Sequence, residues 1–225
     1  MGKAMFVFGL TTWIAVVALG FGGLAVYESR PGLRAVAPQN WPVRSRFARD
    51  PDRWTLLLFL HPRCPCSQAS LQELEELLPG NAARLRARII CNKPKGVPEG
   101  WEKTATWRQA MAMKNVDVIC DENDGERACF GVATSGQVLL YDPNGELRYS
   151  GGITRSRGHP GANAGRAAIE SLLRGESPRS NRQPVFGCPL VDPETFRCEK
   201  GCPCPEKPRN PSRRPKQPQS TRAPF

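Results

Sequence analysis

The sequence has 225 residues, enough for one domain and additional segments. With 40% hydrophobic and 24% charged residues, it is neither a wholly disordered chain, a coiled coil nor a polytopic membrane protein. The formal net charge is +11, and the cysteines number nine, so at least one thiol cannot pair within the chain. Only two histidines are present, which excludes a histidine-rich metal site and a histidine proton relay.

The first segment is apolar and long enough to cross a membrane. No charged residue occurs from Ala4 to Tyr27. A helix of this length, at about 1.5 Å per residue, spans the roughly 30 Å hydrocarbon layer. A secretory signal has a shorter apolar stretch, about 7–15 residues long. We therefore predict a transmembrane anchor at residues 1–27, with cleavage after Ala25 as the alternative. Residues 28–53, rich in Arg and Pro, are predicted to be a linker.

Two signals disagree about the orientation of this anchor. Several arginines follow the span, among them Arg30 and Arg34, and the positive-inside rule alone would place the rest of the chain in the cytoplasm. The cysteine content favours the opposite arrangement, because paired thiols persist in oxidising compartments. We give more weight to the cysteines and expect a single-pass membrane protein whose domain is extracytoplasmic.

The elements of one α/β domain are predicted between residues 54 and 190. Residues 54–60 form a continuous apolar run, as in a strand covered on both faces. Leucines at helical spacing follow, starting at Leu71, and Pro79 and Gly80 end that helix. Further strands are expected at residues 88–91, 116–120, 137–141 and 147–151, and further helices at residues 101–113, 122–130 and 164–173. Asn163 is suited to cap the last helix.

Alternating strands and helices predict a mixed sheet with helices on both faces. A cysteine pair directly follows the first strand. With FLHPRCPCS at this loop, VICDEN and FGVATSGQVLLYDPNGELRYSGGIT beyond it, and then SRGHPG, the chain resembles the thioredoxin-like superfamily. It is similar in particular to membrane-anchored, exported thioredoxin-fold proteins of the RedB type. The resemblance covers roughly residues 50–190 and implies a thioredoxin-like fold with a redox-active dithiol.

The sequence departs from the family's pattern in two places. The redox loop is Cys-Pro-Cys, one residue shorter than the usual Cys-x-x-Cys. The cis-proline expected before the fourth strand is missing, because residues 133–137 read ATSGQ. In the superfamily this proline shapes the substrate groove and keeps metal off the thiols. Its absence weakens a simple reductase interpretation and leaves room for metal binding.

The Cys64-Pro65-Cys66 loop carries the predicted chemistry. A helix N-terminus lowers the pKa of a thiol, and the thiolate is the nucleophile in disulfide exchange. We place Cys64 near the N-cap and Cys66 in the first turn, with Pro65 at a position that proline favours. His61 and Arg63 are close enough in sequence to assist. A small, strained ring predicts a labile disulfide, and the family analogy makes Cys64 the attacking and Cys66 the resolving residue. A fixed staple or two inert thiols are the alternatives.

Other residues are expected at the same edge of the sheet. In this fold the strand before Cys64 runs toward the redox loop, and the hairpin that follows brings two more loops to that edge. Residues predicted to line the site are therefore Thr134, Ser135, Arg155, Arg157 and His159. His159 could deprotonate a thiol or bind metal beside the cysteines, and a surface-loop histidine is the alternative.

The roles of the other cysteines stay open. Cys91 and Cys120 end two strands expected to run parallel to the first, and Cys120 and Cys129 might pair with each other or stay free in the core. Residues 191–225 read as a largely disordered basic tail rich in Pro. A second Cys-Pro-Cys occurs there, and its thiols could exchange with the loop dithiol, hold a soft metal ion or staple the tail. The cysteines of the tail are Cys198, Cys202 and Cys204, and Cys188 lies upstream of them in the stretch VFGCPL.

The sequence thus predicts a membrane-tethered thiol–disulfide oxidoreductase that uses Cys64 and Cys66, without a cofactor, on exported protein partners. The alternative is a copper-handling protein in which Cys64, Cys66 and His159 bind Cu(I), a soft ion that thiolates favour. A non-catalytic thioredoxin-fold adaptor is the third hypothesis. Nucleic acid is not expected as a partner, because no aromatic residues are interleaved with the basic residues of the tail.

Overall fold

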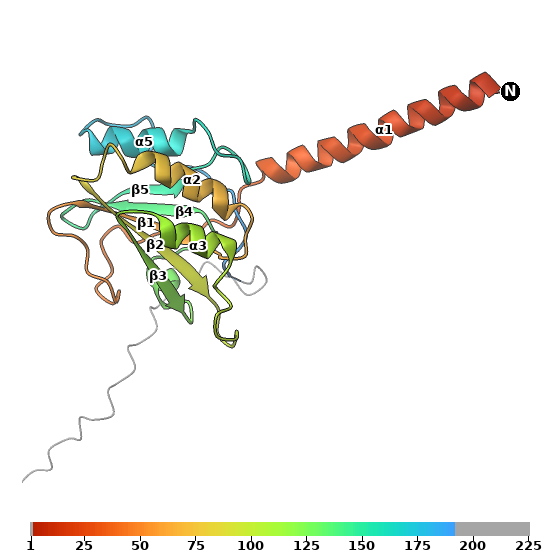
Figure 1. Ribbon diagram of the computed structural model, residues 1–225. Helices are drawn as coiled ribbons and strands as arrows, with labels where there is room; N and C mark the ends of the chain where they lie inside the picture. The colour runs from red at the N-terminus through yellow and green to blue at the C-terminus, as the bar shows by residue number, and fades with distance from the viewer. Residues whose placement is uncertain (1, 192–225) are drawn as a thin grey trace, which may run out of the picture.

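The computed structural model describes residues 2–191, and the predictions made for residues 192–225 lie outside this range. Figure 1 shows a long N-terminal helix and a domain in which helices surround a sheet. The elements, in chain order, are α1 (Gly2–Ser29), β1 (Trp54–Leu60), α2 (Ser67–Leu77), β2 (Leu85–Lys93), α3 (Ala105–Ala112), β3 (Val116–Glu122), α4 (Gly125–Cys129), β4 (Gln137–Tyr141), β5 (Leu147–Gly152) and α5 (Ala164–Leu173).

The sheet has five strands in the order β3-β2-β1-β4-β5. β1 is parallel to β2, and β2 is parallel to β3, whereas β4 is antiparallel to both β1 and β5. β1 occupies the centre because its side chains from Thr55 to Leu60 are all buried, as an uninterrupted apolar run requires. The mixed sheet was predicted, and it is confirmed.

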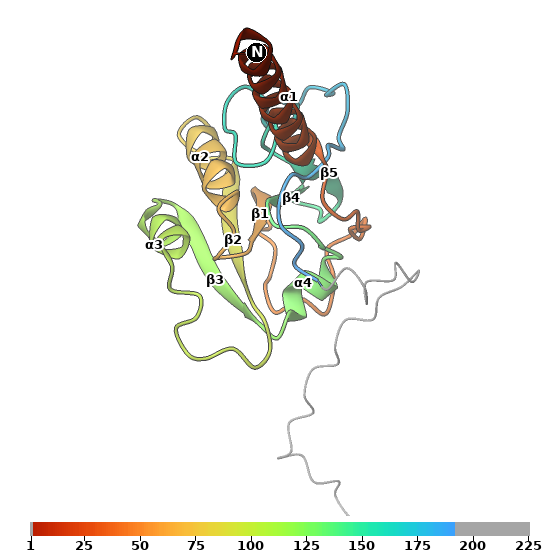
Figure 2. The same cartoon turned by 90° about the vertical axis from the view of Figure 1, so that its right-hand side faces the viewer.

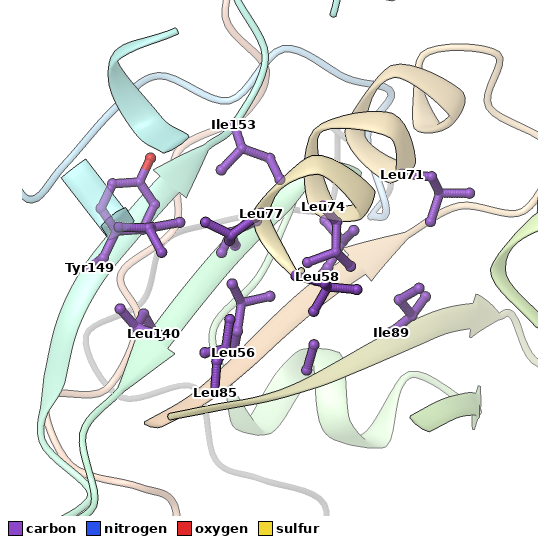
Figure 3. Packing of buried hydrophobic residues seen from close by; sticks show 14 of the residues in the cluster. Leu56, Leu58, Leu71, Leu74, Leu77, Leu85, Ile89, Leu140, Tyr149 and Ile153 are labelled. Carbon is purple, nitrogen blue, oxygen red and sulfur yellow. The ribbon is translucent and has the colours of Figure 1, made fainter. Parts of the chain in front are cut away.

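Helices cover both faces of the sheet, as predicted. On one face, α2, α3 and α5 share a core with alternate residues of β1 and β2. Figure 3 shows Leu74 and Leu77 of α2 over Leu56 and Leu58 of β1. On the other face, Phe130 at the end of α4 packs against the intervening residues of the strands. Figure 2 shows α3 and α4 on opposite sides of the sheet, so the central strands are shielded from solvent on both faces.

Helix α1 has the length and composition of a membrane-spanning segment. It is 28 residues long, its side chains are not buried inside the protein, and it projects away from the domain in Figure 1. A signal sequence near an N-terminus meets the same criteria. The end of α1 contacts the domain, since the Arg157 amide donates a hydrogen bond to the Glu28 carbonyl at 3.1 Å, and the Arg157 guanidinium lies 5.1 Å from the centre of the Tyr27 ring.

The predicted helix at residues 101–113 is shorter in the structure. Helix α3 begins only after Thr104, whose side-chain oxygen accepts a hydrogen bond from the Trp107 amide at 3.3 Å. This capping interaction holds Thr104 in an extended conformation, so the residues before it form turns. At α5 the predicted cap is confirmed, because the Asn163 side chain accepts a hydrogen bond from the Arg166 amide at 2.8 Å.

Candidate functional site

The loop between β1 and α2 holds the two predicted redox cysteines, but the start of the helix differs from the prediction. Cys66, not Cys64, is at the N-cap of α2. The Cys64 carbonyl accepts a hydrogen bond from the Ser67 amide, and the Pro65 carbonyl accepts one from the Gln68 amide. Both bonds span three residues and form a turn tighter than an α-helix, so the regular helix begins at Ser67. Pro65 accordingly precedes the helix and does not occupy its first turn.

The nearest partner of Cys64 is a third cysteine. Cys64 is buried, with 2% of its surface exposed, and its Sγ lies 2.8 Å from the Sγ of Cys188. A disulfide bond is about 2.05 Å long, and both residues are free cysteines in this structure. The two sulfurs are therefore in direct contact as thiols, close enough to form a bond after a small movement.

The three thiols differ in their acidity. The pKa of Cys64 is lowered to about 5, because its hydrogen bond with the Cys188 side chain outweighs the effect of burial. Burial, followed by the negative charge of Cys64, raises the pKa of Cys66. The hydrogen bond to Cys64 and then burial raise the pKa of Cys188. Cys64 is thus the first of the three to ionise, and the thiolate is the reactive form.

Arg157 lies beside these thiols, as the sequence predicted. Its guanidinium donates a hydrogen bond to the carbonyl oxygen of Gly187, next to Cys188. Its positive charge acts to lower the pKa of both Cys66 and Cys188, although burial has the larger effect on each. Arg155, which was also expected at this edge, is exposed.

A buried hydrogen-bond network fixes the redox loop to the turn before β4. The His61 amide donates to Ser135 Oγ at 2.9 Å, and the Ser67 hydroxyl donates to the His61 carbonyl at 3.0 Å. Because Ser67 uses its proton there, the 3.1 Å contact between the two hydroxyls has Ser135 as donor. Thr134 is also buried and donates to the Leu33 carbonyl at 2.9 Å. Thr134 and Ser135, both predicted at this edge of the sheet, therefore lie there, and their side chains hold the backbone groups of Leu33 and His61 in place.

His61 and Arg63 interact mainly with Trp101. The His61 ring meets the Trp101 ring edge to face at 5.4 Å, and the Arg63 guanidinium lies 4.8 Å from the Trp101 ring centre. Burial lowers the pKa of His61, whereas the charge of Cys64 acts to raise it. His61 is thus near the thiolate, but the cation of Arg63 is held by an aromatic ring. Direct assistance by Arg63 stays a prediction.

His159 does not join the cysteines. Its side chain is exposed, and its Nδ1 lies 2.7 Å from the Arg157 carbonyl of its own loop. Within residues 2–191, no three or more His, Cys, Asp or Glu side chains are grouped so that they could hold a metal ion. The proposed copper ligands Cys64, Cys66 and His159 therefore do not form a preassembled site, because the hairpin loop turns His159 toward solvent.

The remaining described cysteines separate into two groups. Cys91 and Cys120 are opposite each other in the β2–β3 register, and both are free. Cys129 is disulfide-bonded, so the considered pairing with Cys120 is wrong. The physical reason is that the sheet lies between Cys120 and Cys129. Cys120 faces the same side of the sheet as its register partner Cys91, which belongs to the core under α2, whereas Cys129 packs on the opposite face.

Cys188 was not among the residues predicted to lie at the redox loop. It is 124 positions from Cys64, and no periodic pattern links two residues so far apart. The only usable signal was the apolar VFGCPL stretch, which is long enough to pair with the sheet edge. The structure pairs residues 188–190 with residues 133–135 and so brings Cys188 to the redox loop.

Comparisons with known proteins support the fold. No protein-family model matches the chain, and no curated protein matches it significantly. Among solved structures, a hypothetical protein from Sinorhizobium meliloti is 20% identical, with a TM-score of 0.53, covering 72% of this chain and 93% of its own. An uncharacterised conserved protein from Geobacillus kaustophilus is 19% identical, with a TM-score of 0.52, and the match covers 73% of this chain and 93% of that protein. The exposed lipoprotein thioredoxin of Streptococcus pneumoniae is 17% identical, with a TM-score of 0.43, covering 62% and 99%.

The strand order, the helices on both faces and the cysteines at the start of α2 define the class of protein. The chain has a thioredoxin-like fold, as its sequence predicted. At these levels of identity the solved structures show the fold alone, so the chemistry has to follow from the site.

Proposed function

We propose that this protein is a membrane-tethered thiol–disulfide oxidoreductase that acts on protein thiols or disulfides of exported partners. The observation that carries the proposal is the geometry at Cys64, a buried thiol just before helix α2 whose Sγ lies 2.8 Å from the Sγ of Cys188. This hydrogen bond lowers the pKa of Cys64 to about 5. A thiol with this pKa is ionised at neutral pH and ready to attack a disulfide. Helix α1 supports the tether by its length and apolar composition.

The chemistry consists of two exchanges. The Cys64 thiolate attacks one sulfur of a partner disulfide, the partner's S–S bond breaks, and the released partner sulfur takes up a proton. A second thiol of this chain, predicted to be Cys66, then loses its proton and attacks Cys64 Sγ. The partner's second sulfur leaves and is protonated. The partner has gained two electrons, and this chain holds a disulfide; the reverse sequence oxidises a partner dithiol.

The site residues supply positioning for these steps. Ser135 and Ser67 fix the backbone of His61, so the loop that carries Cys64 is held against the turn before β4. The helix N-terminus at Cys66 favours negative charge beside it. Copper binding by Cys64, Cys66 and His159 is not favoured by this geometry, since His159 is hydrogen-bonded within its own exposed loop.

Substitution of single cysteines tests the proposal. The assay is the reduction of insulin disulfides by the purified protein, recycled with dithiothreitol. We expect Cys64→Ser to abolish the acceleration over dithiothreitol alone. Cys120→Ser, which changes a free cysteine at the far edge of the sheet, is the matched control and should keep the wild-type rate. Equal rates for both variants would show that Cys64 is not the nucleophile.

A further inference from the structure

The segment that carries Cys188 follows the edge of the sheet. The Ser150 amide donates to the Asn181 carbonyl at 3.0 Å, and the Gly152 amide donates to the Pro184 carbonyl at 3.2 Å. Gly152 permits this approach, because a Cβ there would lie only 2.7 Å from the Pro184 oxygen. The segment therefore runs beside β5 before it reaches the redox loop.

Residues 187–190, called the strand below, then pair with the turn before β4 through one antiparallel β-bridge. The Ser135 amide donates to the Cys188 carbonyl at 2.9 Å, and the Leu190 amide donates to the Ala133 carbonyl at 2.8 Å. Pro189 lies opposite Thr134 in this pairing. The two hydrogen bonds hold Cys188 in register with the redox loop. Backbone pairing, in addition to the contact between the sulfurs, therefore keeps Cys188 beside Cys64.

This strand also covers the reactive sulfur. Cys64 is only 2% exposed, although it lies in a loop that must meet a partner protein, and Cys188 is one of the side chains in contact with its Sγ. A partner disulfide therefore cannot reach Cys64 while the strand is in place. The Ser135 amide and the Ala133 carbonyl, which the strand uses, are backbone groups that any extended peptide could use in its absence.

We propose that residues 187–190 are a tethered resolving strand: an extended, cystine-containing segment of a partner displaces it to react with Cys64, and Cys188 then returns and releases that partner. The inference rests on the proposed function, since it requires Cys64 to be the attacking residue. It adds a second resolving thiol to Cys66 and assigns the strand an active part in product release.

Resolution by Cys188 exchanges one disulfide bond for another. The Cys64 thiolate first forms a mixed disulfide with the partner, whose other sulfur leaves and is protonated. The Cys188 thiol gives up its proton, and its sulfur attacks Cys64 Sγ. The Cys64–Cys188 bond forms, the Cys64–partner bond breaks, and the departing partner sulfur takes a proton. The strand regains its two backbone hydrogen bonds to Ala133 and Ser135 at the same time, and the partner segment is displaced from these groups.

The experiment uses oxidised glutathione as the probe disulfide and the full-length protein in detergent. Two variants are compared, Cys66→Ser and the double variant Cys66→Ser/Cys188→Ser. Both are treated with the probe, alkylated and digested, and the state of Cys64 is mapped by mass spectrometry. A tethered thiol acts at an effective concentration on the order of millimolar, so it competes well against micromolar glutathione.

We expect the double variant to accumulate glutathione on Cys64, and Cys66→Ser to show a Cys64–Cys188 disulfide in place of the adduct. Equal adduct levels in the two variants would overturn the resolving role of Cys188 and leave the proposed function intact. Cys64 unmodified in both variants would instead overturn the proposed function, and the inference with it.

A second comparison tests the strand without altering a thiol. In the Cys66→Ser background, Gly187→Ala adds a Cβ that would lie 1.9 Å from the Ser135 carbonyl oxygen, so the strand must shift away. Gly80→Ala, with no atom within 4 Å of the added Cβ, is the matched control. We expect the Cys64–Cys188 disulfide to form more slowly in the Gly187 variant than in the control. Equal rates would show that the backbone pairing does not position Cys188.

Discussion

Cys64 and Cys91 are both buried, but their thiols differ in acidity because their neighbours differ. Burial alone raises the pKa of a thiol, and Cys91 follows this rule, with a pKa raised to about 12 by burial and by the charges of Cys120 and Glu102. Cys64 is also buried, but the hydrogen bond from Cys188 stabilises its thiolate and lowers its pKa to about 5. The low pKa of Cys64 is therefore set by its hydrogen-bond partner and not by exposure to solvent.

The pH dependence of alkylation tests this assignment. The thiolate is the reacting form, so the rate of Cys64 modification by iodoacetamide should rise with pH through about 5 and then level off. Replacing Cys188 with Ala removes the stabilising hydrogen bond, and the midpoint should move upward in pH. The rate is followed by mass spectrometry of the Cys64 peptide, with Cys120→Ser as the control. A midpoint that stays near 5 without Cys188 would show that another group stabilises the Cys64 thiolate.

At the scale of elements, helices α2 and α5 are joined by a buried carboxylate. Glu73 in α2 is fully buried and receives hydrogen bonds from the Gly161 amide and, at 2.8 Å, from the Asn163 side chain. Arg166 of α5 forms an ion pair with it at 2.9 Å. The Glu73 side chain thus accepts hydrogen bonds from residues just before α5 and ties α2, which follows the redox loop, to the start of α5.

Removal of this carboxylate should destabilise the domain. Glu73→Ala removes the buried carboxylate that accepts from the Gly161 amide and the Asn163 side chain, whereas Arg166 keeps its ion pairs with Glu76 and Glu170. We expect a loss of about 2 kcal/mol in the free energy of unfolding. Urea denaturation measures the change. Glu75→Ala, an exposed position on the same helix, is the control and should stay within about 0.5 kcal/mol of wild type. A similar loss in both variants would argue against the buried network.

Local patterns predicted most elements because the relevant information lies within a few residues. The apolar run of β1, the β4 strand and the Asn163 cap of α5 were each predicted with the bounds that the structure has. The start of α2 was predicted two residues too early, since the tight turn around Pro65 depends on hydrogen bonds that composition does not reveal. Cys188 was not predicted at the site because its pairing is with backbone distant in sequence.

At the scale of the whole molecule, α1 and the domain have different surroundings. Within residues 2–191 no side chain of α1 is buried, whereas the domain buries its apolar residues in two cores, one on each face of the sheet. An exposed apolar helix of 28 residues is costly in water and favourable in a bilayer. Helix α1 and the domain should therefore be separable.

A chain lacking residues 1–29 tests this separation. We expect the full-length protein to sediment with membranes and to resist carbonate extraction, whereas the shortened protein stays in the supernatant with an unchanged circular dichroism spectrum. Fractionation followed by immunoblotting gives the result. Appearance of the full-length protein as a shorter, soluble product would instead identify α1 as a cleaved signal.

The contact between Arg157 and the end of α1 determines how far the cysteines lie from that end of the helix. The Arg157 guanidinium reaches the Tyr27 ring in one direction and the Gly187 carbonyl, beside Cys188, in the other. With α1 in a bilayer, one side chain would separate the sulfurs from the lipid headgroups. Substrates would then be selected by how close to the lipid surface they carry their cysteines, and a loop that extends far above the membrane would be out of range.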